Sequence, residues 1–350
     1  MMLELKKFTA LITCLALVCA LLSGCAQTDD ANTLKVYNWG DYIAEGVIDD
    51  FEAETGIKVI YDTFDQNEDL YTKITTSSAS YDVIIPSDYI IQRLISEDRL
   101  TKINMDNVPN YALIDDKFKH FDYDPNGEYS IPYMWGTVGI IYNTTMVSDP
   151  VDSWGILWDE KYAGQIFMMN SVRDSIGITL KYLGHSMNST EQAHIDAARN
   201  KLIEQKPLVL AYTGDEIKDK MIAGEGALAV VYSGDAITMI EQNPDLAYAI
   251  PEEGSNLWYD GMCILKNSAH KENAEKFIDF MCRTDIAERN RAYINYSTPQ
   301  KDVYEALPDE IRNDPTQYPS DELLAKCEVY KDLGERVKMY DQMWVEILGS

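Results

Sequence analysis

The sequence is poor in the residues that build disulfide frameworks, zinc centres and common catalytic motifs. Its 350 residues include only six cysteines and four histidines. No cysteine pair has the CxxC spacing, and the histidines lack the spacing of metal ligands. The GxSxG, P-loop, GxGxxG and HExxH motifs are also absent. These absences give no support for catalysis or a cofactor, and they predict buried thiols at Cys263, Cys282 and Cys327.

Apolar runs long enough to cross a bilayer are absent after residue 22. The one early apolar stretch, 8–22, follows two lysines and precedes the tetrapeptide Leu22-Ser23-Gly24-Cys25. A basic start, a short apolar stretch and small residues before a cysteine are typical of an exported precursor. The tetrapeptide resembles the bacterial lipobox, which implies cleavage before Cys25 and lipid attachment to it. We therefore expect a signal peptide over 1–24, a tether over 25–32 and an extracytoplasmic, lipid-anchored protein in the periplasm or on the outer face of the membrane.

Basic residues are scarce in this chain. It has 30 lysines and arginines against 58 aspartates and glutamates, a formal net charge of −28 at pH 7. Such a surface repels polyanions, which argues against nucleic acid as a partner. It attracts cationic solutes, although the same charge suits any acidic extracellular protein. The charge therefore favours a cationic partner and says nothing about the fold.

Short β-type runs alternate with helical patterns along most of the chain, which favours an α/β fold. We expect strands at 34–38, 57–61 and 82–86, separated by two amphipathic helices. The first helix should end at Gly56, and Asn67 should cap the second. Together these elements predict a βαβαβ unit.

A second unit of the same kind is predicted further along the chain. Its expected strands lie at 165–169, 208–212 and 227–231, with helices near 173–184 and 190–204. The stretch after Pro315 is expected to be helical, because Leu323, Leu324, Cys327, Val337 and Trp344 are its apolar positions.

Two β-rich segments, 130–143 and 247–265, flank the second unit. They indicate that the chain leaves a first lobe, builds a second lobe and returns. We therefore assign 33–135 plus 256–312 to lobe 1 and 139–252 plus 313–350 to lobe 2.

Two tryptophan-x-carboxylate triplets, Trp39-Gly40-Asp41 and Trp258-Tyr259-Asp260, suggest a binding chemistry. An aromatic face attracts a desolvated cation by roughly 0.5 to 2 kcal/mol, and a carboxylate adds charge-assisted hydrogen bonds. The alternative is that each Trp is a core residue and each Asp a cap or turn residue. Recurrence of the triplet favours an organic ammonium site.

Two further motifs repeat at a spacing of 20 residues: Tyr212-Thr213-Gly214-Asp215 and Tyr232-Ser233-Gly234-Asp235. Each closes an expected strand and opens an expected helix. We predict that both aspartates cap their helices and that Tyr232 faces a cleft between the two lobes.

The segment Asp122 to Gly127 matches the beginning of a calcium loop. The twelfth position of that loop should be glutamate, but it is Tyr133, and Pro125 further restricts the path. We therefore expect a turn here, without a metal.

An ordered series of motifs, rather than any single one, carries a resemblance to a known family. The motifs are Tyr37-Asn38-Trp39-Gly40-Asp41-Tyr42-Ile43, Glu54-Thr55-Gly56-Ile57-Lys58-Val59, Tyr81-Asp82-Val83 to Pro86-Ser87, Ser130-Ile131-Pro132-Tyr133-Met134-Trp135-Gly136, Asn256-Leu257-Trp258-Tyr259-Asp260 and Tyr296-Ser297-Thr298-Pro299. Over nearly the whole mature chain the sequence resembles the bacterial spermidine/putrescine-binding lipoproteins, the substrate-binding subunits of polyamine ABC importers.

The resemblance implies a two-lobed α/β fold of the periplasmic-binding-protein type (type II), with hinge crossings and a central cleft. It implies a monomer that captures a polyamine, spermidine or putrescine, and delivers it to the permease of an ABC transporter, without acting as an enzyme. The residues implied to bind the ligand are Trp39, Asp41, Tyr42, Ser87, Tyr89, Asp174, Tyr232, Trp258, Asp260 and Tyr296.

The chain departs from the family pattern at several of these places. Asn170 and Ser171 stand where many relatives have a carboxylate, and Asp174 is one methylene shorter than glutamate. Tyr232 stands where tryptophan is frequent, and Tyr330 where glutamine can occur. We expect Arg173 to orient Asp174 or bind backbone rather than touch a cationic ligand.

Three other functions stay open. A sugar receptor would also use Trp and Asp, but with more Lys, Arg, Asn and Gln around the hydroxyls. A ferric-iron receptor of similar architecture often uses adjacent tyrosines, and the chain has no Tyr-Tyr pair. A surface glycoside hydrolase would need two of Asp41, Asp174 and Asp260 to flank one bond.

Overall fold

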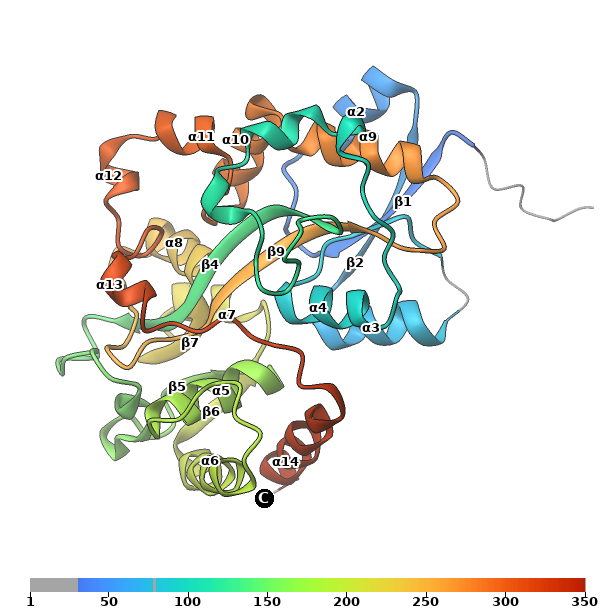
Figure 1. Ribbon diagram of the computed structural model, residues 1–350. Coiled ribbons are helices and arrows are strands. Elements are labelled where there is room, and N and C mark those ends of the chain that lie inside the picture. Colours follow the sequence, from blue (N-terminus) through green and yellow to red (C-terminus); the bar gives the residue numbers. More distant parts are fainter. Residues whose placement is uncertain (1–30, 78–79, 350) are drawn as a thin grey trace, which may run out of the picture.

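The computed structural model of the protein describes residues 31–77 and 80–349. The predicted signal peptide, Cys25 and most of the predicted tether lie outside the described residues. Figure 1 shows strands in the middle of the molecule, with helices around them. The strands are β1 (Thr33–Trp39), β2 (Lys58–Phe64), β3 (Val83–Ile84), β4 (Ser130–Asn143), β5 (Ile166–Met169), β6 (Val209–Thr213), β7 (Leu228–Tyr232), β8 (Leu246–Ala249) and β9 (Leu257–Ile264).

The helices vary from single turns to four turns. They are α2 (Val47–Thr55), α3 (Asn67–Thr76), α4 (Asp88–Ser96), α5 (Val172–Tyr182), α6 (Gln192–Gln205), α7 (Ile217–Ile222), α8 (Ser233–Gln242), α9 (Lys271–Met281), α10 (Thr284–Ile294), α11 (Lys301–Ala306), α12 (Asp309–Arg312), α13 (Asp321–Leu324) and α14 (Val337–Gly349). Short 3-10 helices lie at Met105–Asn107, Pro109–Leu113, Asp116–Phe118, Trp154–Trp158, Glu160–Tyr162, Lys206–Leu208 and Gly334–Arg336.

Within the described residues the strands form a nine-stranded sheet in the order β2-β1-β3-β9-β4-β7-β5-β6, with β8 beside β4. The strands β2, β1 and β3 are parallel, and so are β6, β5 and β7. These are the two predicted α/β units. The strands β4 and β9 run antiparallel to each other and join the units.

The first α/β unit matches its prediction closely, with two differences. Phe51 of α2 packs edge-on against Phe277 at 5.2 Å between ring centres, and Gly56 ends the helix in the left-handed region, at a φ of 71°. Asn67, the predicted cap of α3, lies inside the helix, and the cap position belongs to Gln66. The Asn67 amide instead donates to Ser87 Oγ at 3.0 Å. The third strand is shorter than predicted, because only Val83 and Ile84 make ladder pairs.

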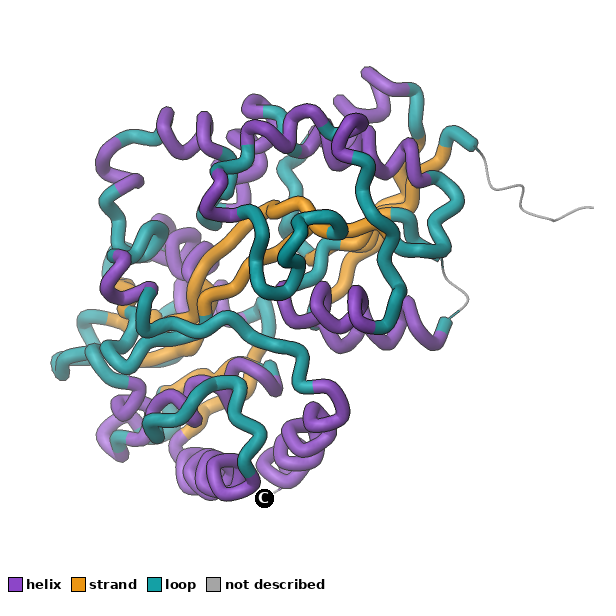
Figure 2. The backbone as a smooth tube through the Cα atoms, in the orientation of Figure 1, coloured by secondary structure: helices purple, strands orange, loops and turns teal. Residues whose placement is uncertain are grey.

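The strand β4 belongs to both halves of the molecule, which makes it the first predicted crossing. Its residues 130–137 pair with β9, and its residues 138–142 pair with β7. Figure 2 shows β4 and β9 as two long neighbouring strands between the halves. The fold is therefore two-lobed, as predicted, while the exact lobe boundaries stay a prediction.

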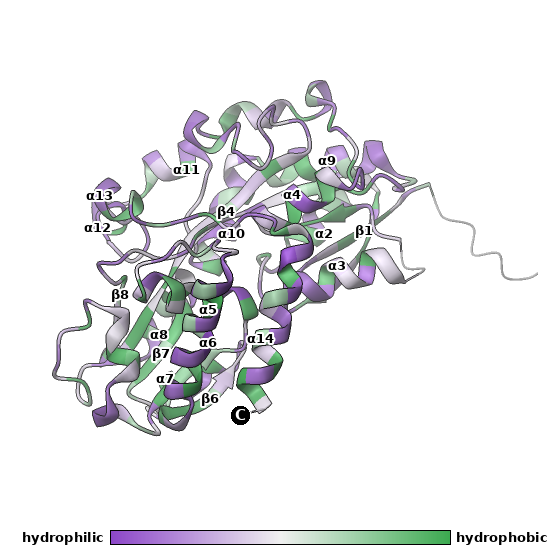
Figure 3. Cartoon of the chain, turned by 60° about the horizontal axis from the view of Figure 1, so that its bottom comes forward, coloured by the Kyte–Doolittle hydropathy of each residue, from purple (hydrophilic) through white to green (hydrophobic). Residues whose placement is uncertain are grey.

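The C-terminal stretch is only partly helical. Residues 325–336 form neither a strand nor an α-helix and lead from α13 to α14. α14 packs against α5 and α6 through Tyr340, Trp344 and Ile347. In Figure 3 the residues of α14 alternate between apolar and polar along the helix. The chain thus passes between the lobes a third time, because α12 lies beside α11 in Figure 1 and α14 lies in the other lobe.

Smaller predictions were also tested by the structure. Cys263 and Cys282 are buried thiols, whereas Cys327 is partly exposed. The Asp122 to Gly127 segment is a turn, in which buried Asp124 accepts hydrogen bonds from the backbone N–H groups of Tyr129 and Ser130 at 2.9 and 3.0 Å. No helix within residues 31–77 and 80–349 has the length and apolarity that a bilayer span requires.

Candidate functional site

A cavity of about 380 Å³ lies between the two α/β units, and a hollow of about 110 Å³ adjoins it. The two spaces share lining residues, among them Trp39, Ser87 and Tyr232, so they are compartments of one cleft. All ten residues predicted to bind ligand line at least one compartment. The structure therefore brings together residues from position 39 to position 296, and it leaves none of the ten elsewhere.

The cleft lies at the carboxyl ends of parallel strands. Trp39 ends β1, Ser87 follows β3, Asp174 follows β5 and Tyr232 ends β7. Loops at this edge of a sheet are free to differ in sequence while the strands hold them in place, which is where α/β proteins usually bind ligands. The position of the cleft thus follows from the topology of the two units.

Asp260 is a buried lining residue of the smaller compartment, with 4% of its surface exposed. Ser87 Oγ donates to its Oδ1 at 2.6 Å, and the Tyr42 hydroxyl donates to its Oδ2 at 2.7 Å. Burial raises the pKa of Asp260 to about 7, against the effect of these two hydrogen bonds. No basic side chain of the described residues pairs with Asp260, so the ionised carboxylate would gain from a cationic ligand.

Asp174 is the buried carboxylate of the larger compartment. Ser171, the N-cap of α5, donates to Asp174 Oδ2 at 2.6 Å, and the Tyr232 hydroxyl donates to the same atom at 2.9 Å. Burial raises the pKa of Asp174, and the nearby Arg173 opposes this shift.

Arg173 lines the larger compartment, and its guanidinium binds backbone, as predicted. Its guanidinium donates to the Lys331 backbone carbonyl at 3.1 Å and to Asn188 Oδ1 at 3.0 Å. It also lies over the rings of Tyr89 and Tyr330, at 5.0 and 4.4 Å. Backbone, amide and aromatic groups therefore hold the Arg173 guanidinium in place, while its buried Nε has no hydrogen-bond partner among the described residues.

Aromatic rings form the apolar part of the cleft. The Trp258 and Tyr296 rings meet edge to face at 4.9 Å, and the Tyr232 ring meets Trp258 at 6.0 Å. Trp39 is partly buried and packs against Phe64 at 4.5 Å. The Tyr89 hydroxyl donates to Glu68 at 2.9 Å. Rings held in this way present faces of fixed orientation to a guest.

Two glycines make room for these rings. A Cβ on Gly136 would lie 2.6 Å from the Trp258 ring, and one on Gly234 would lie 2.3 Å from the Tyr296 ring. Real Cβ atoms do not approach rings so closely, and both rings are packed by neighbours. The aromatic wall therefore depends on two positions that lack a side chain.

We expect Gly234→Ala to lower the free energy of unfolding by about 1–3 kcal/mol, because the added methyl group overpacks the Tyr296 ring. Urea unfolding followed by tryptophan fluorescence measures this change. Gly349→Ala is the matched control, since nothing lies within 4 Å of a Cβ at that helical position. Equal stability of the two variants would contradict the packing assigned to Gly234.

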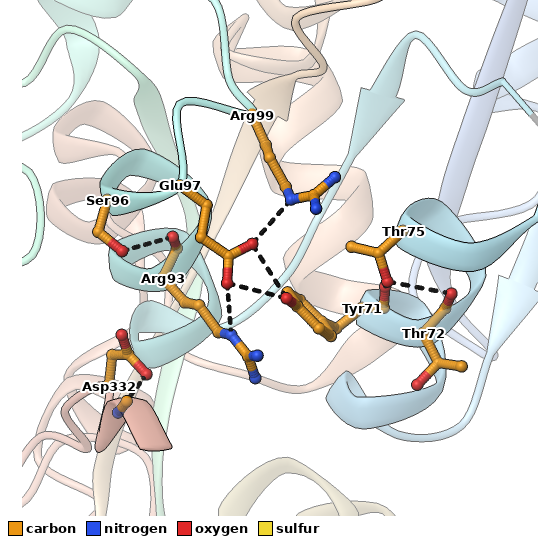
Figure 4. A network of polar contacts seen from close by, with 9 residues as sticks. Tyr71, Thr72, Thr75, Arg93, Ser96, Glu97, Arg99 and Asp332 are labelled. Carbon is orange, nitrogen blue, oxygen red and sulfur yellow. Dashed lines mark hydrogen bonds and ion pairs between the residues drawn. The ribbon is translucent and has the colours of Figure 1, made fainter.

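Residues of α3 and α4 line the cleft, and a polar network around Glu97 joins the two helices, as Figure 4 shows. The Tyr71 hydroxyl donates to both oxygens of Glu97, at 2.8 and 3.0 Å. Arg93 and Arg99 pair with the same carboxylate at 3.0 and 2.7 Å, and the Arg93 guanidinium lies 3.7 Å from the Tyr71 ring centre. Because this network joins α3 to the end of α4, it helps to fix Glu68 relative to Tyr89.

Sequence reasoning missed several carboxylates of the cleft. Asp88 is fully buried and accepts from the backbone N–H groups of Tyr89 and Tyr259, at 2.7 and 3.0 Å. Burial raises its pKa to about 8 and also raises the pKa of Glu68. Glu68 follows the carboxyl end of β2, and Asp88 follows that of β3. This position after a strand is the sequence signal that could have identified both residues as part of the cleft.

The predicted capping roles of Asp215 and Asp235 are wrong. Neither side chain caps its helix: Asp235 lies in the first turn of α8, and Asp215 precedes α7. Both line the cleft, and Lys218 lies 3.7 Å from Asp235 Oδ1. Burial raises the pKa of Asp235 to about 6, although Lys218 opposes the shift. Each Tyr-x-Gly-Asp motif therefore places its aspartate in the lining of the cleft and not at a helix cap.

Comparisons with known proteins agree with this geometry. Residues 46–319 match the family described as bacterial extracellular solute-binding protein. The spermidine/putrescine-binding periplasmic protein of Escherichia coli K12 is 34% identical, over 94% of this chain and 95% of its own. A solved structure of a spermidine/putrescine ABC transporter protein from Listeria monocytogenes has 42% identity and a TM-score of 0.87, covering 91% of this chain and 99% of the other. The spermidine/putrescine ABC transporter substrate-binding protein of Streptococcus pneumoniae has 37% identity and a TM-score of 0.79, covering 91% and 98%.

Proposed function

The chain belongs to the family of bacterial extracellular solute-binding proteins, and on this basis we propose that it captures polyamines for an ABC-type permease. One observation carries the proposal: buried Asp260 and Asp174 line a cleft that several aromatic side chains also line. The names of its relatives, which bind spermidine and putrescine, support the same ligand class.

The charge of the cleft agrees with a cationic guest. Two basic side chains, Arg173 and Lys218, are found among its described lining residues. They face nine carboxylates: Asp41, Asp65, Glu68, Asp88, Asp174, Asp215, Glu216, Asp235 and Asp260. Burying an unpaired charge is costly, so a multiply protonated guest gains its affinity by neutralising these groups.

We assign the main ammonium contacts to Asp260 and Asp174. Trp39, Tyr89 and Trp258 would flank the methylenes between the ammoniums, since an aromatic face suits both a hydrocarbon segment and a nearby cation. Ser87, Tyr42 and Tyr232 donate to the two carboxylates and thereby fix the orientation of their free lone pairs. Tyr296 completes the wall beside Trp258, and Asp41 supplies a further negative charge at the edge.

We also propose how the protein is held and how it works. Lobe 1 (33–135 plus 256–312) and lobe 2 (139–252 plus 313–350) would close on the guest around β4 and β9. In the structure Gln66 Nε2 already reaches across to the Asn170 backbone carbonyl at 3.1 Å. A lipid on Cys25 would keep the monomer at the extracytoplasmic face of the membrane, within reach of the permease.

We propose binding without catalysis. A glycosidase needs one carboxyl group kept as an acid and a second one ionised. Here burial raises the pKa of both Asp260 and Asp174, and hydroxyl groups donate to both. A sugar receptor is also disfavoured, because the lining carries an excess of negative charge that sugar hydroxyls do not neutralise.

A thermal-shift panel tests the proposal. Putrescine, spermidine and spermine should raise the melting temperature, since ligand at 100 times its dissociation constant adds about 2.7 kcal/mol to stability. 1,4-Butanediol is the matched control, because it has the length of putrescine without its charges and should have no effect. Stabilisation by maltose or ferric citrate, with no response to any amine, would replace polyamines by one of the other receptor ligands.

A further inference from the structure

The cleft already contains an ammonium group that belongs to the protein. Lys218 lies on α7, and its Nζ is 3.7 Å from Asp41 Oδ2 and 3.7 Å from Asp235 Oδ1. Its side chain keeps only 22% of its surface exposed. Asp41 follows β1 in the first α/β unit and Asp235 lies on α8 in the second, so Lys218 bridges the two units.

A third carboxylate, that of Asp215, lies near the same ammonium. Asp215 lines the compartment with Lys218, and a Cβ on Gly40 would lie 3.7 Å from Asp215 Oδ2, which places that carboxylate against the loop after β1. Burial acts to lower the pKa of Lys218, but Asp235, Asp215 and Asp41 together raise it. Lys218 therefore stays protonated at neutral pH.

Lys218 lines the same compartment as Asp260 and Trp258. Its side chain is an ammonium on four methylenes, which is the chemistry of the aminobutyl end of a polyamine. It provides a positive charge beside Asp41, Asp215 and Asp235 before any guest arrives. Asp260 and Asp174 are left without a cationic partner among the described residues, apart from the partial effect of Arg173 on Asp174.

We propose that Lys218 determines specificity by standing in for one ammonium of the guest, so that the cleft favours diamines over triamines. This inference rests on the proposed function. A diamine brings two charges, one for each of the two carboxylates to which we assign the main ammonium contacts, Asp260 and Asp174. A triamine brings a third ammonium that meets Lys218 and is repelled by it, and such repulsion is a common way to exclude a related ligand.

Removal of the Lys218 charge tests the proposal. We expect wild-type protein to bind putrescine more tightly than spermidine. In Lys218→Met the ratio of spermidine affinity to putrescine affinity should rise by roughly 10- to 100-fold, because three carboxylates lose their partner and like-charge repulsion disappears. Isothermal titration calorimetry with both amines measures the ratio.

Two further variants make the test specific. Lys220→Met removes a lysine from the same helix that pairs with Glu225 at 3.4 Å outside the cleft, and it should leave the ratio unchanged. Lys218→Arg keeps the charge and should also keep the preference for the diamine.

The outcomes separate this inference from the proposed function. Amine binding by wild type together with an unchanged ratio in Lys218→Met would overturn the role of Lys218 alone, as would a wild-type preference for spermidine. If wild type bound neither amine, the proposed function would fail and the role of Lys218 with it.

Discussion

Asp260→Asn should weaken polyamine binding by about 3–5 kcal/mol, a loss of about two to four orders of magnitude in affinity. Asp260 is fully desolvated, and its carboxylate is the strongest candidate for a direct ammonium contact. The amide removes the charge but keeps the size of the side chain and an oxygen that accepts from Ser87 or Tyr42. Calorimetric titration with putrescine and spermidine measures the loss.

The same substitution should stabilise the ligand-free protein. The folded-state pKa of Asp260 is raised to about 7, so the folded protein binds a proton more readily than the unfolded chain does. Ionising Asp260 without a guest therefore costs stability above pH 7, and we expect Asp260→Asn to recover ~2 kcal/mol there. A binding residue that destabilises the empty site is the expected trade between function and stability.

Asp124→Asn is the matched control for Asp260→Asn. Asp124 is as buried as Asp260, with 3% exposure, but it accepts backbone N–H groups in a turn away from the cleft lining. Its replacement should lower stability and leave polyamine affinity intact. Unchanged affinity in Asp260→Asn would remove Asp260 from the ammonium contacts.

Polyamine affinity should rise with pH between about 5.5 and 7.5. The pKa values of Asp260 and Asp235 are raised to about 7 and about 6, and those of Asp174 and Glu68 are raised as well. Alkyl ammoniums stay protonated to about pH 10, so only the protein titrates in this range. Each carboxyl group that must ionise on binding contributes up to about a tenfold change in affinity per pH unit below its pKa.

The sign of the effect on the empty protein is opposite. A carboxyl group whose folded-state pKa is raised contributes most to stability below its unfolded pKa of about 4, and this contribution is lost as the pH rises through about 7. These carboxyl groups should therefore lower the melting temperature of the ligand-free protein at pH 8 relative to pH 5.

Proton release upon binding gives an independent measure. Calorimetry at pH 6.5 in two buffers with different ionisation enthalpies should show about one proton released per polyamine, since Asp260 is largely protonated in the empty site at this pH. Asp88, with a pKa raised to about 8, adds to the release if it also ionises. Identical heats in both buffers and a flat affinity from pH 5.5 to 7.5 would refute the linkage.

Most of the fold could be predicted from the sequence, because the spacing of apolar residues that marks helices and strands involves only neighbouring positions. β1, β2 and α2 lie within a few residues of their expected positions, and β4 spans the predicted 130–143. The errors arose where tertiary contacts overrode a local signal. Asn67 carries a capping side chain, but the hydroxyl of Ser87 binds it instead. Residues 325–336 have helical composition, yet their backbone pairs elsewhere: the Glu328 carbonyl accepts from Leu257 N at 3.0 Å.

The cleft was predicted less completely than the fold. The ten residues suggested by the family resemblance all line it, because ordered motifs transfer by position. Glu68, Asp88, Asp235 and Lys218 were missed, because their environments come from distant segments. Asp235 and Lys218 matter only once α7 and α8 lie next to the loop after β1, and no local pattern encodes that neighbourhood.

The three passages of the chain between the lobes have a consequence for biosynthesis. The first half of β4 lacks its partner until β9 is made, and α5 and α6 lack their cover until α14, the last helix, is made. Pairings between such distant segments form late, because long loops must close first. We therefore expect a partly synthesised or partly secreted chain to lack the β4–β9 pairing and the cover of α5 and α6 until these later segments follow.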